Sequence, residues 1–183
     1  MGLTVYFGHD GECCPRSSAA TKLTVVDITG VHSLRICWCR CQLREDPLQL
    51  LSARLYPASM NCPRTAFTFR LLDDFLLSNK ISGCPAQSYY DRVRRLTDSA
   101  FPNKVPVRVS PIETLCIYHS YEQNRTRELL RVSRQWRNLK LRKWNGFGHE
   151  RGSIGPGELA VSCPACPRPG INLLPGWEQD TDQ

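Results

Sequence analysis

The order of apolar and polar residues predicts a β-rich N-terminal part. Residues 22–28 and 31–36 are two runs rich in β-branched side chains, and the Thr29-Gly30 pair between them is typical of a hairpin turn. A shorter β-rich run covers residues 3–7. Because a hairpin brings its open ends together, the segment before residue 22 should return beside the segment after residue 36.

Apolar residues that recur every three or four positions predict three helices after this part. The first begins at Asp46-Pro47, an acidic N-cap followed by proline, and ends at Tyr56-Pro57. The second begins at Pro63, and the third covers residues 86–100. The side chains expected to face the core are Leu48, Leu51 and Leu55 in the first helix, Phe67, Leu71, Leu72, Phe75 and Leu76 in the second, and Tyr89, Val93 and Leu96 in the third.

A longer, basic helix is predicted from Asn124 to about Asn145. Between Arg125 and Lys143 there are eight Lys or Arg and one acid, so this stretch carries the whole net charge of +7. Its apolar side should hold Leu129, Leu130, Trp136, Leu139 and Trp144, with the tryptophans in the core. The basic side is either simply solvated or contacts nucleic-acid phosphates, through Arg131, Arg134, Arg137, Lys140, Arg142 and Lys143.

The candidate chemistry lies in the cysteines around the hairpin. Cys37, Cys39 and Cys41 alternate at the end of the second hairpin strand. Buried free cysteine is the simpler reading for Cys37, whereas Cys39 and Cys41 can approach one metal ion from a turn. The hairpin geometry brings Cys14 beside them, and the first short strand can bring His9. These four residues make a feasible zinc site.

A second pair of thiols, Cys163 and Cys166, has the two-residue spacing of a zinc knuckle. Its partners are not identified, and His149 is the nearest candidate.

Composition narrows the class of protein. A chain of 183 residues with 41% hydrophobic content suits one domain, or a small domain with an attached helical part. We find no signal peptide and no run of eighteen apolar residues. The ten cysteines therefore favour reduced thiols and metal ligands, with a disulfide-bonded secreted protein as the alternative. The aspartates show no two-metal nuclease pattern and no cysteine nucleophile has an organised base, so we expect neither an enzyme nor a small-molecule substrate.

Residues 101–123 read as an irregular insert. Pro102, Pro106 and Pro111 forbid a continuous helix, and residues 107–123 show no period. Residues 107–123 are either a retained intron translated in frame or an ordinary surface loop.

Several motifs in order resemble the CxC-type cysteine cluster found beside KDZ (Kyakuja-Dileera-Zisupton) transposases of fungi. They are Gly8-His9-Asp10-Gly11 with Cys14-Pro15, residues 25–32, Cys39-Arg40-Cys41, residues 49–58, residues 65–72, and residues 163–167 with 170–173. In that family the cluster is a predicted zinc-chelating module, and a separate RNase H-like domain is the nuclease. The resemblance carries over His9, Cys14, Cys39, Cys41, Cys163 and Cys166 as ligands.

The resulting expectation is an α+β fold, with a small zinc-bound N-terminal β-sheet or hairpin, a helical bundle and a C-terminal CPxC knuckle. Residues 1–100 would form the cysteine cluster, 101–123 the insert, and 124–183 the basic helix with the knuckle. The resemblance implies a nuclear, zinc-binding accessory module, as a fragment or decayed copy of a transposase, that contacts DNA or the transposase nuclease domain or another subunit. The alternative is a protein-interaction module that does not bind DNA.

Overall fold

The computed structural model describes residues 4–41, 45–102, 118–149, 152–155 and 157–159. The chain divides into two compact units, Met1–Asn138 and Leu139–Gln183, which are considered separately. Of the elements in the described residues, the first unit contains all of the strands and three of the four α-helices, and helix α4 continues from the first unit into the second.

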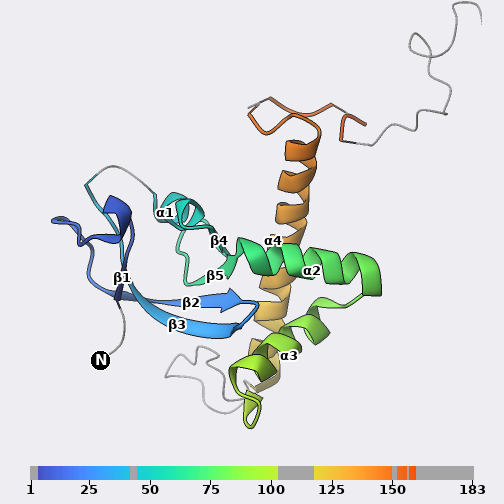
Figure 1. Cartoon of the computed structure of the whole chain (residues 1–183), viewed down its shortest axis with the longest axis horizontal. Helices are drawn as coiled ribbons and strands as arrows, with labels where there is room; N and C mark the ends of the chain where they lie inside the picture. Colours follow the sequence, from blue (N-terminus) through green and yellow to red (C-terminus); the bar gives the residue numbers. More distant parts are fainter. Residues whose placement is uncertain (1–3, 42–44, 103–117, 150–151, 156, 160–183) are drawn as a thin grey trace, which may run out of the picture. The chain divides into compact units, whose positions relative to one another are not determined.

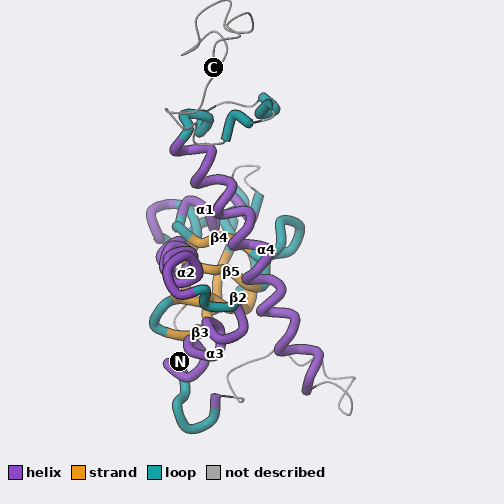
Figure 2. The backbone as a smooth tube through the Cα atoms, turned by 90° about the vertical axis from the view of Figure 1, so that its right-hand side faces the viewer, coloured by secondary structure: helices purple, strands orange, loops and turns teal. Residues whose placement is uncertain are grey.

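A five-stranded mixed sheet forms the centre of the first unit, with the strand order β1-β3-β2-β5-β4. Strands β2 (Thr21–Asp27) and β3 (Gly30–Cys37) pair antiparallel, so the predicted hairpin is confirmed. Strand β1 (Thr4–Tyr6) runs parallel to β3, and β5 (Thr65–Thr68) runs parallel to β2. Strand β4 (Leu55–Pro57) completes the edge beside β5. Figure 2 shows β4, β5, β2 and β3 one after another.

The part of the chain that the structure describes also contains four α-helices and one short 3-10 helix. Helix α1 covers Asp46–Ser52, α2 Phe69–Ser82, α3 Ala86–Thr97 and α4 Tyr118–Trp144 (Figure 1). The 3-10 helix η1, His9–Gly11, follows β1. The fold is therefore mixed α and β, as expected.

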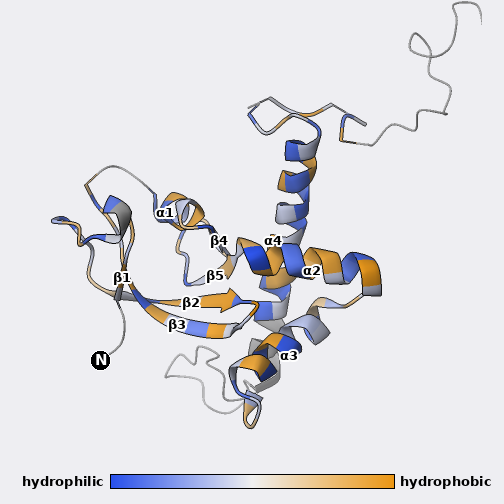
Figure 3. Cartoon of the chain, viewed as in Figure 1, coloured by the Kyte–Doolittle hydropathy of each residue, from blue (hydrophilic) through white to orange (hydrophobic). Residues whose placement is uncertain are grey.

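Two hydrophobic clusters lie on opposite faces of the sheet, because neighbouring residues of a strand point to opposite sides. Val26 of β2 belongs to the larger cluster and Val25 to the smaller one. The larger cluster joins the sheet to α2, α3 and α4, and the smaller one joins it to α1, to Phe7 and to Trp38. Figure 3 shows hydrophobic colouring along β2. A strand that is covered on both faces needs apolar residues on both sides.

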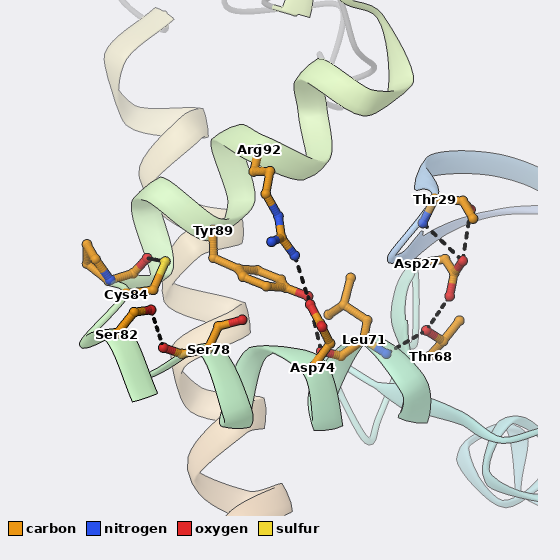
Figure 4. A network of polar contacts seen from close by, with 11 residues as sticks. Asp27, Thr29, Thr68, Leu71, Asp74, Ser78, Ser82, Cys84, Tyr89 and Arg92 are labelled. Carbon is orange, nitrogen blue, oxygen red and sulfur yellow. Dashed lines mark hydrogen bonds and ion pairs between the residues drawn. The ribbon is translucent and has the colours of Figure 1, made fainter. Parts of the chain in front are cut away.

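Polar contacts fix the helices to the sheet and to each other (Figure 4). Thr68 caps α2, because its Oγ1 accepts a 3.1 Å hydrogen bond from the Leu71 N–H, and it donates a 2.7 Å bond to Asp27 at the end of β2. Between α2 and α3, Asp74 accepts hydrogen bonds from the Tyr89 hydroxyl at 2.6 Å and from Arg92 at 2.8 Å. Burial and the Asp74 carboxylate raise the pKa of Tyr89 well above its usual value, so the hydroxyl remains a donor.

The predicted helical bundle is wrong in its arrangement, because α2, α3 and α4 share one core with the sheet. The second helix does not begin at Pro63: residues 65–68 form β5, and α2 begins at Phe69. Residues 55–57, taken as the end of the first helix, form β4. A four-residue apolar spacing from Phe67 is also an even spacing, so it fits a strand face as well as a helix face.

Several predicted core positions also differ. Leu48, Leu96, Leu130, Leu139 and Trp144 are exposed, whereas Leu71, Leu72, Phe75, Leu76, Tyr89, Val93, Leu129 and Trp136 are buried as expected. In α1 the buried residues are Pro47, Gln49 and Leu50, and Leu50 packs in the smaller cluster. Asp46 does not cap α1; Glu45 occupies that position, and the Asp46 carboxylate pairs with Arg40.

Helix α4 begins at Tyr118, six residues before the predicted Asn124. The last six residues of the predicted irregular insert, 118–123, are therefore helical. They contain neither proline nor glycine, so no residue in them interrupts a helix. Residues 103–117 lie outside the described residues. Among the described helices, none combines the length and the apolar character needed to cross a membrane.

Candidate metal centre

Four metal-ligating side chains converge at one end of the hairpin. His9 comes from η1, Cys14 from the loop that follows it, and Cys39 and Cys41 from the segment after β3. One ligand atom from each lies within 4.8 Å of every other. The four residues that the sequence brought together are thus neighbours in space.

The distances within this group suit a tetrahedral metal ion. The Cys14 Sγ lies 3.6 Å from the Cys39 Sγ and 3.2 Å from the Cys41 Sγ, and the Cys39 Sγ lies 3.4 Å from the His9 Nε2. Ligands placed about 2.3 Å from a tetrahedral zinc ion are roughly 3.8 Å apart. A small contraction or expansion around an ion would satisfy this geometry, so three thiolates and one imidazole could hold one metal ion.

The approach of His9 depends on the glycine before it. Gly8 has φ 84° and ψ 174°, a combination that is essentially restricted to glycine. A Cβ at Gly8 would lie 2.9 Å from the Cys39 Cβ, which is closer than real Cβ atoms approach. His9 itself has φ 47°. A bare backbone at Gly8 therefore lets the histidine segment pack directly against Cys39.

Backbone groups shape the electrostatics of Cys14. The Arg16 N–H lies 3.3 Å from the Cys14 Sγ. Burial alone would raise the pKa of Cys14, but hydrogen bonds with the Cys41 thiol, with the Arg16 and Arg40 N–H groups and with the Cys39 thiol outweigh burial and lower it from 9.0 to about 6. The hydrogen bond to Cys14, burial and the Cys14 charge raise the pKa of Cys41. One thiolate thus forms readily in this group, and it favours the binding of a cation.

Two backbone hydrogen bonds pair residues 38–40 of the Cys-x-Cys segment with residues 16–18, which follow Cys14. The Ser18 N–H donates to the Trp38 carbonyl at 2.9 Å, and the Arg40 N–H donates to the Arg16 carbonyl at 3.1 Å. This pairing fixes the spacing between Cys14 and the two later cysteines.

A family model described as CxC2 like cysteine cluster associated with KDZ transposases matches residues 1–100. The chain belongs to this family. The matched region contains all four converging side chains and ends just after α3. Comparisons with curated proteins and with solved structures found no match.

The remaining cysteines of the CxC2-like region do not join the group. Cys37 is buried, as expected of an apolar side chain, and Cys13 and Cys62 are exposed. Cys163 and Cys166 lie outside the described residues, so the second knuckle stays a prediction. His149, its nearest candidate partner, is exposed.

The predicted nucleic-acid-binding side chains lie along α4. Arg131, Arg134, Arg137 and Lys143 are exposed, and Lys140 and Arg142 are half-buried. The Arg131 guanidinium donates to the Ala58 carbonyl, and the Arg137 guanidinium donates to the Asn79 Oδ1 at 3.3 Å.

Two further α4 side chains face the core. Arg125 is buried and so does not belong to the exposed basic side. Trp136 packs in the larger cluster, and its indole N–H donates to the Asp73 carboxylate at 2.8 Å. This position excludes base stacking by Trp136 in the folded chain.

Two features of the centre escaped the sequence reasoning. Gly8 directly follows the β-rich run over residues 3–7, and its place immediately before His9 was a usable signal. Gln49 is buried and bonds to Cys39, and no local pattern distinguishes it from an exposed glutamine.

Proposed function

We propose that this CxC2-like chain is a zinc-binding accessory module of a KDZ-type DNA transposase. The observation that carries the proposal is the convergence of His9, Cys14, Cys39 and Cys41, whose ligand atoms all lie within 4.8 Å of one another. The family's association with KDZ transposases supplies the setting.

The donor set favours zinc over the other common divalent ions. Thiolates select soft or borderline metals, and three sulfur donors with one imidazole form a familiar closed tetrahedral zinc site. With four protein ligands, the ion would have a structural role and would tie η1 and the Cys14 loop to the end of β3. Such binding contributes directly to the free energy of folding.

The module would also contact DNA through the exposed basic side chains of α4. Arg134, Arg137 and Lys143 are exposed and basic, and phosphate contacts by such side chains are independent of base sequence. Binding of this kind would hold the transposase on DNA without selecting a target.

A second candidate function is docking of the transposase nuclease domain or another subunit. The outer side of α2 carries Leu77 and Ile81, four residues apart, with 57% and 77% of their surface exposed. An apolar pair on one helix side is the kind of contact that a protein partner covers.

Metal analysis tests the zinc proposal. The full chain, purified with reductant and without chelator, should hold one zinc ion at this centre, and a Cys39→Ser/Cys41→Ser variant should lose it. Retention of a second ion by that variant would indicate that Cys163 and Cys166 also bind metal. A folded wild-type chain that binds no zinc when the ion is supplied would refute the proposal.

Salt-dependent binding separates the two partners. A variant with Arg134, Arg137 and Lys143 changed to Gln should bind all duplex DNA sequences more weakly, and the salt slope should decrease by about one unit per lost contact. Leu77→Ser/Ile81→Ser should leave DNA binding unchanged. If the charge variant binds DNA as the wild type does while the α2 variant no longer binds the transposase nuclease domain, the docking function is the correct one.

A further inference from the structure

A buried glutamine in α1 holds the backbone of one metal ligand. Gln49 is only 2% exposed. Its Oε1 accepts a 2.9 Å hydrogen bond from the Cys39 N–H, and its Nε2 donates a 3.0 Å hydrogen bond to the Cys39 carbonyl. Both peptide groups of Cys39 are therefore satisfied by one side chain.

The geometry of the Cys-x-Cys segment explains why Cys39 needs such a partner. Trp38 and Arg40 use their backbone groups to pair with the Arg16–Ser18 segment on one side. In an extended chain the next residue directs its N–H and C=O to the opposite side, so those of Cys39 point away from this pairing. A buried N–H or C=O without a partner is costly, and the Gln49 amide takes the place of a neighbouring strand.

A second contact from the same helix acts on the next residue. The Asp46 carboxylate pairs with both terminal nitrogens of the Arg40 guanidinium, at 2.6 and 3.2 Å. Helix α1 thus holds the backbone of Cys39 and the side chain of Arg40. Because alternate side chains of an extended segment point to opposite sides, holding Arg40 in this way directs Cys39 and Cys41 toward the metal centre.

We propose that Gln49 is a positioning residue of the metal centre, which fixes Cys39 so that its Sγ meets Cys14, Cys41 and His9 at one point. The inference rests on the proposed metal-binding function. Groups that orient metal ligands without touching the ion commonly change metal affinity by about 10- to 100-fold when they are removed. Gln49 should have an effect of this size.

The test compares Gln49→Leu with Gln49→Glu in the full chain. Leucine fills the space but makes neither hydrogen bond, whereas a glutamate carboxylate accepts from the Cys39 N–H and cannot donate to its carbonyl. Leu50→Ala is the matched control, because Leu50 is the next residue of α1 and is fully buried in the smaller cluster but has no bond to Cys39. Zinc affinity is measured by chelator competition at a temperature at which circular dichroism shows every variant folded. Cobalt(II) absorption reports the ligand geometry.

Gln49→Leu should weaken zinc binding by about 10- to 100-fold and shift the cobalt d–d bands, and Gln49→Glu should give a smaller loss. Leu50→Ala should lower thermal stability while the cobalt spectrum stays like that of the wild type. If the affinity and spectrum of Gln49→Leu match those of Leu50→Ala, the positioning role is refuted and the metal site itself stands. Should Gln49→Leu fail to fold, Gln49→Met takes its place, because methionine has a similar length and makes neither hydrogen bond; an unchanged affinity and spectrum in Gln49→Met would refute the role. Failure of the wild-type chain to bind either metal would refute the proposed function instead.

Discussion

Replacement of Gly8 by alanine should damage the metal centre through a single added methyl group. The Cβ would lie 2.9 Å from the Cys39 Cβ, whereas ordinary contact begins near 3.4 Å. Cys39 would have to retreat by about 0.5 Å, which exceeds the ±0.2 Å within which metal–ligand distances are normally held. Zinc affinity should therefore fall together with stability.

The expected loss of stability can be worked from two terms. The φ of 84° and ψ of 174° at Gly8 lie in a region that costs a non-glycine residue on the order of 1–3 kcal/mol. Overpacking against Cys39 adds roughly 1–3 kcal/mol. The sum is a large part of the roughly 5–15 kcal/mol that stabilises a typical domain.

Gly11 provides the matched control for this substitution. It is the last residue of η1, three residues after Gly8, and has φ 94°, but a Cβ there would meet no atom within 4 Å. Gly11→Ala should show only the backbone strain, about 1–2 kcal/mol, with unchanged zinc affinity. Urea unfolding of the zinc-loaded chains and chelator competition measure the two quantities. Equal zinc affinities for Gly8→Ala and Gly11→Ala would show that the contact with Cys39 does not limit the site.

Further predictions concern the thiols and the core. Cys14→Ser should weaken zinc binding, measured by chelator competition, by about 100-fold or more, since one of four ligands is lost. Cys13 is adjacent and exposed, so the Cys13→Ser variant should bind zinc as the wild type does in the same assay. In the metal-free chain the folded state lowers the Cys14 pKa from 9.0 to about 6, so between these values the folded chain holds fewer protons than the unfolded one. Its free energy of unfolding should then rise from pH 6 to pH 9, and a flat or falling profile in urea titrations would contradict the shift. Leu129→Ala should destabilise the chain by about 2–5 kcal/mol because Leu129 is fully buried, whereas Leu130→Ala, at a position that is 39% exposed, should change the unfolding free energy by no more than about 0.5 kcal/mol.

Much of the metal centre could be predicted because it depends on local geometry. A hairpin joins its own ends, so the β2–β3 pairing carries Cys14 to the end of the strand that precedes Cys39 and Cys41. Only His9 needed a further assumption, the pairing of the first strand with the hairpin, and β1 does pair with β3.

The path of the chain around the sheet could not be predicted in the same way. Residues 65–68 join the sheet because they find β2 and β4 as partners, and those partners are distant in sequence. The apolar spacing of Phe67 and Leu71 is compatible with both a strand and a helix, so the pattern alone favoured the wrong element. The exposed Leu48 and Leu96 have a similar cause, since which side of a helix is buried depends on where it packs.

The sequence by itself determined the hairpin, the convergence of His9, Cys14, Cys39 and Cys41, and the basic helix, because short loops and local periods define them. Tertiary structure decided which groups support the ligands. Gln49 joins the centre only when α1 packs on the sheet. Its side-chain amide then bonds to the N–H and C=O of Cys39. Gly8 becomes indispensable only when its backbone meets the Cys39 Cβ. Gly8 is 31 residues from Cys39 in the sequence and Gln49 is 10 residues from it. Each reaches Cys39 only when the chain has folded.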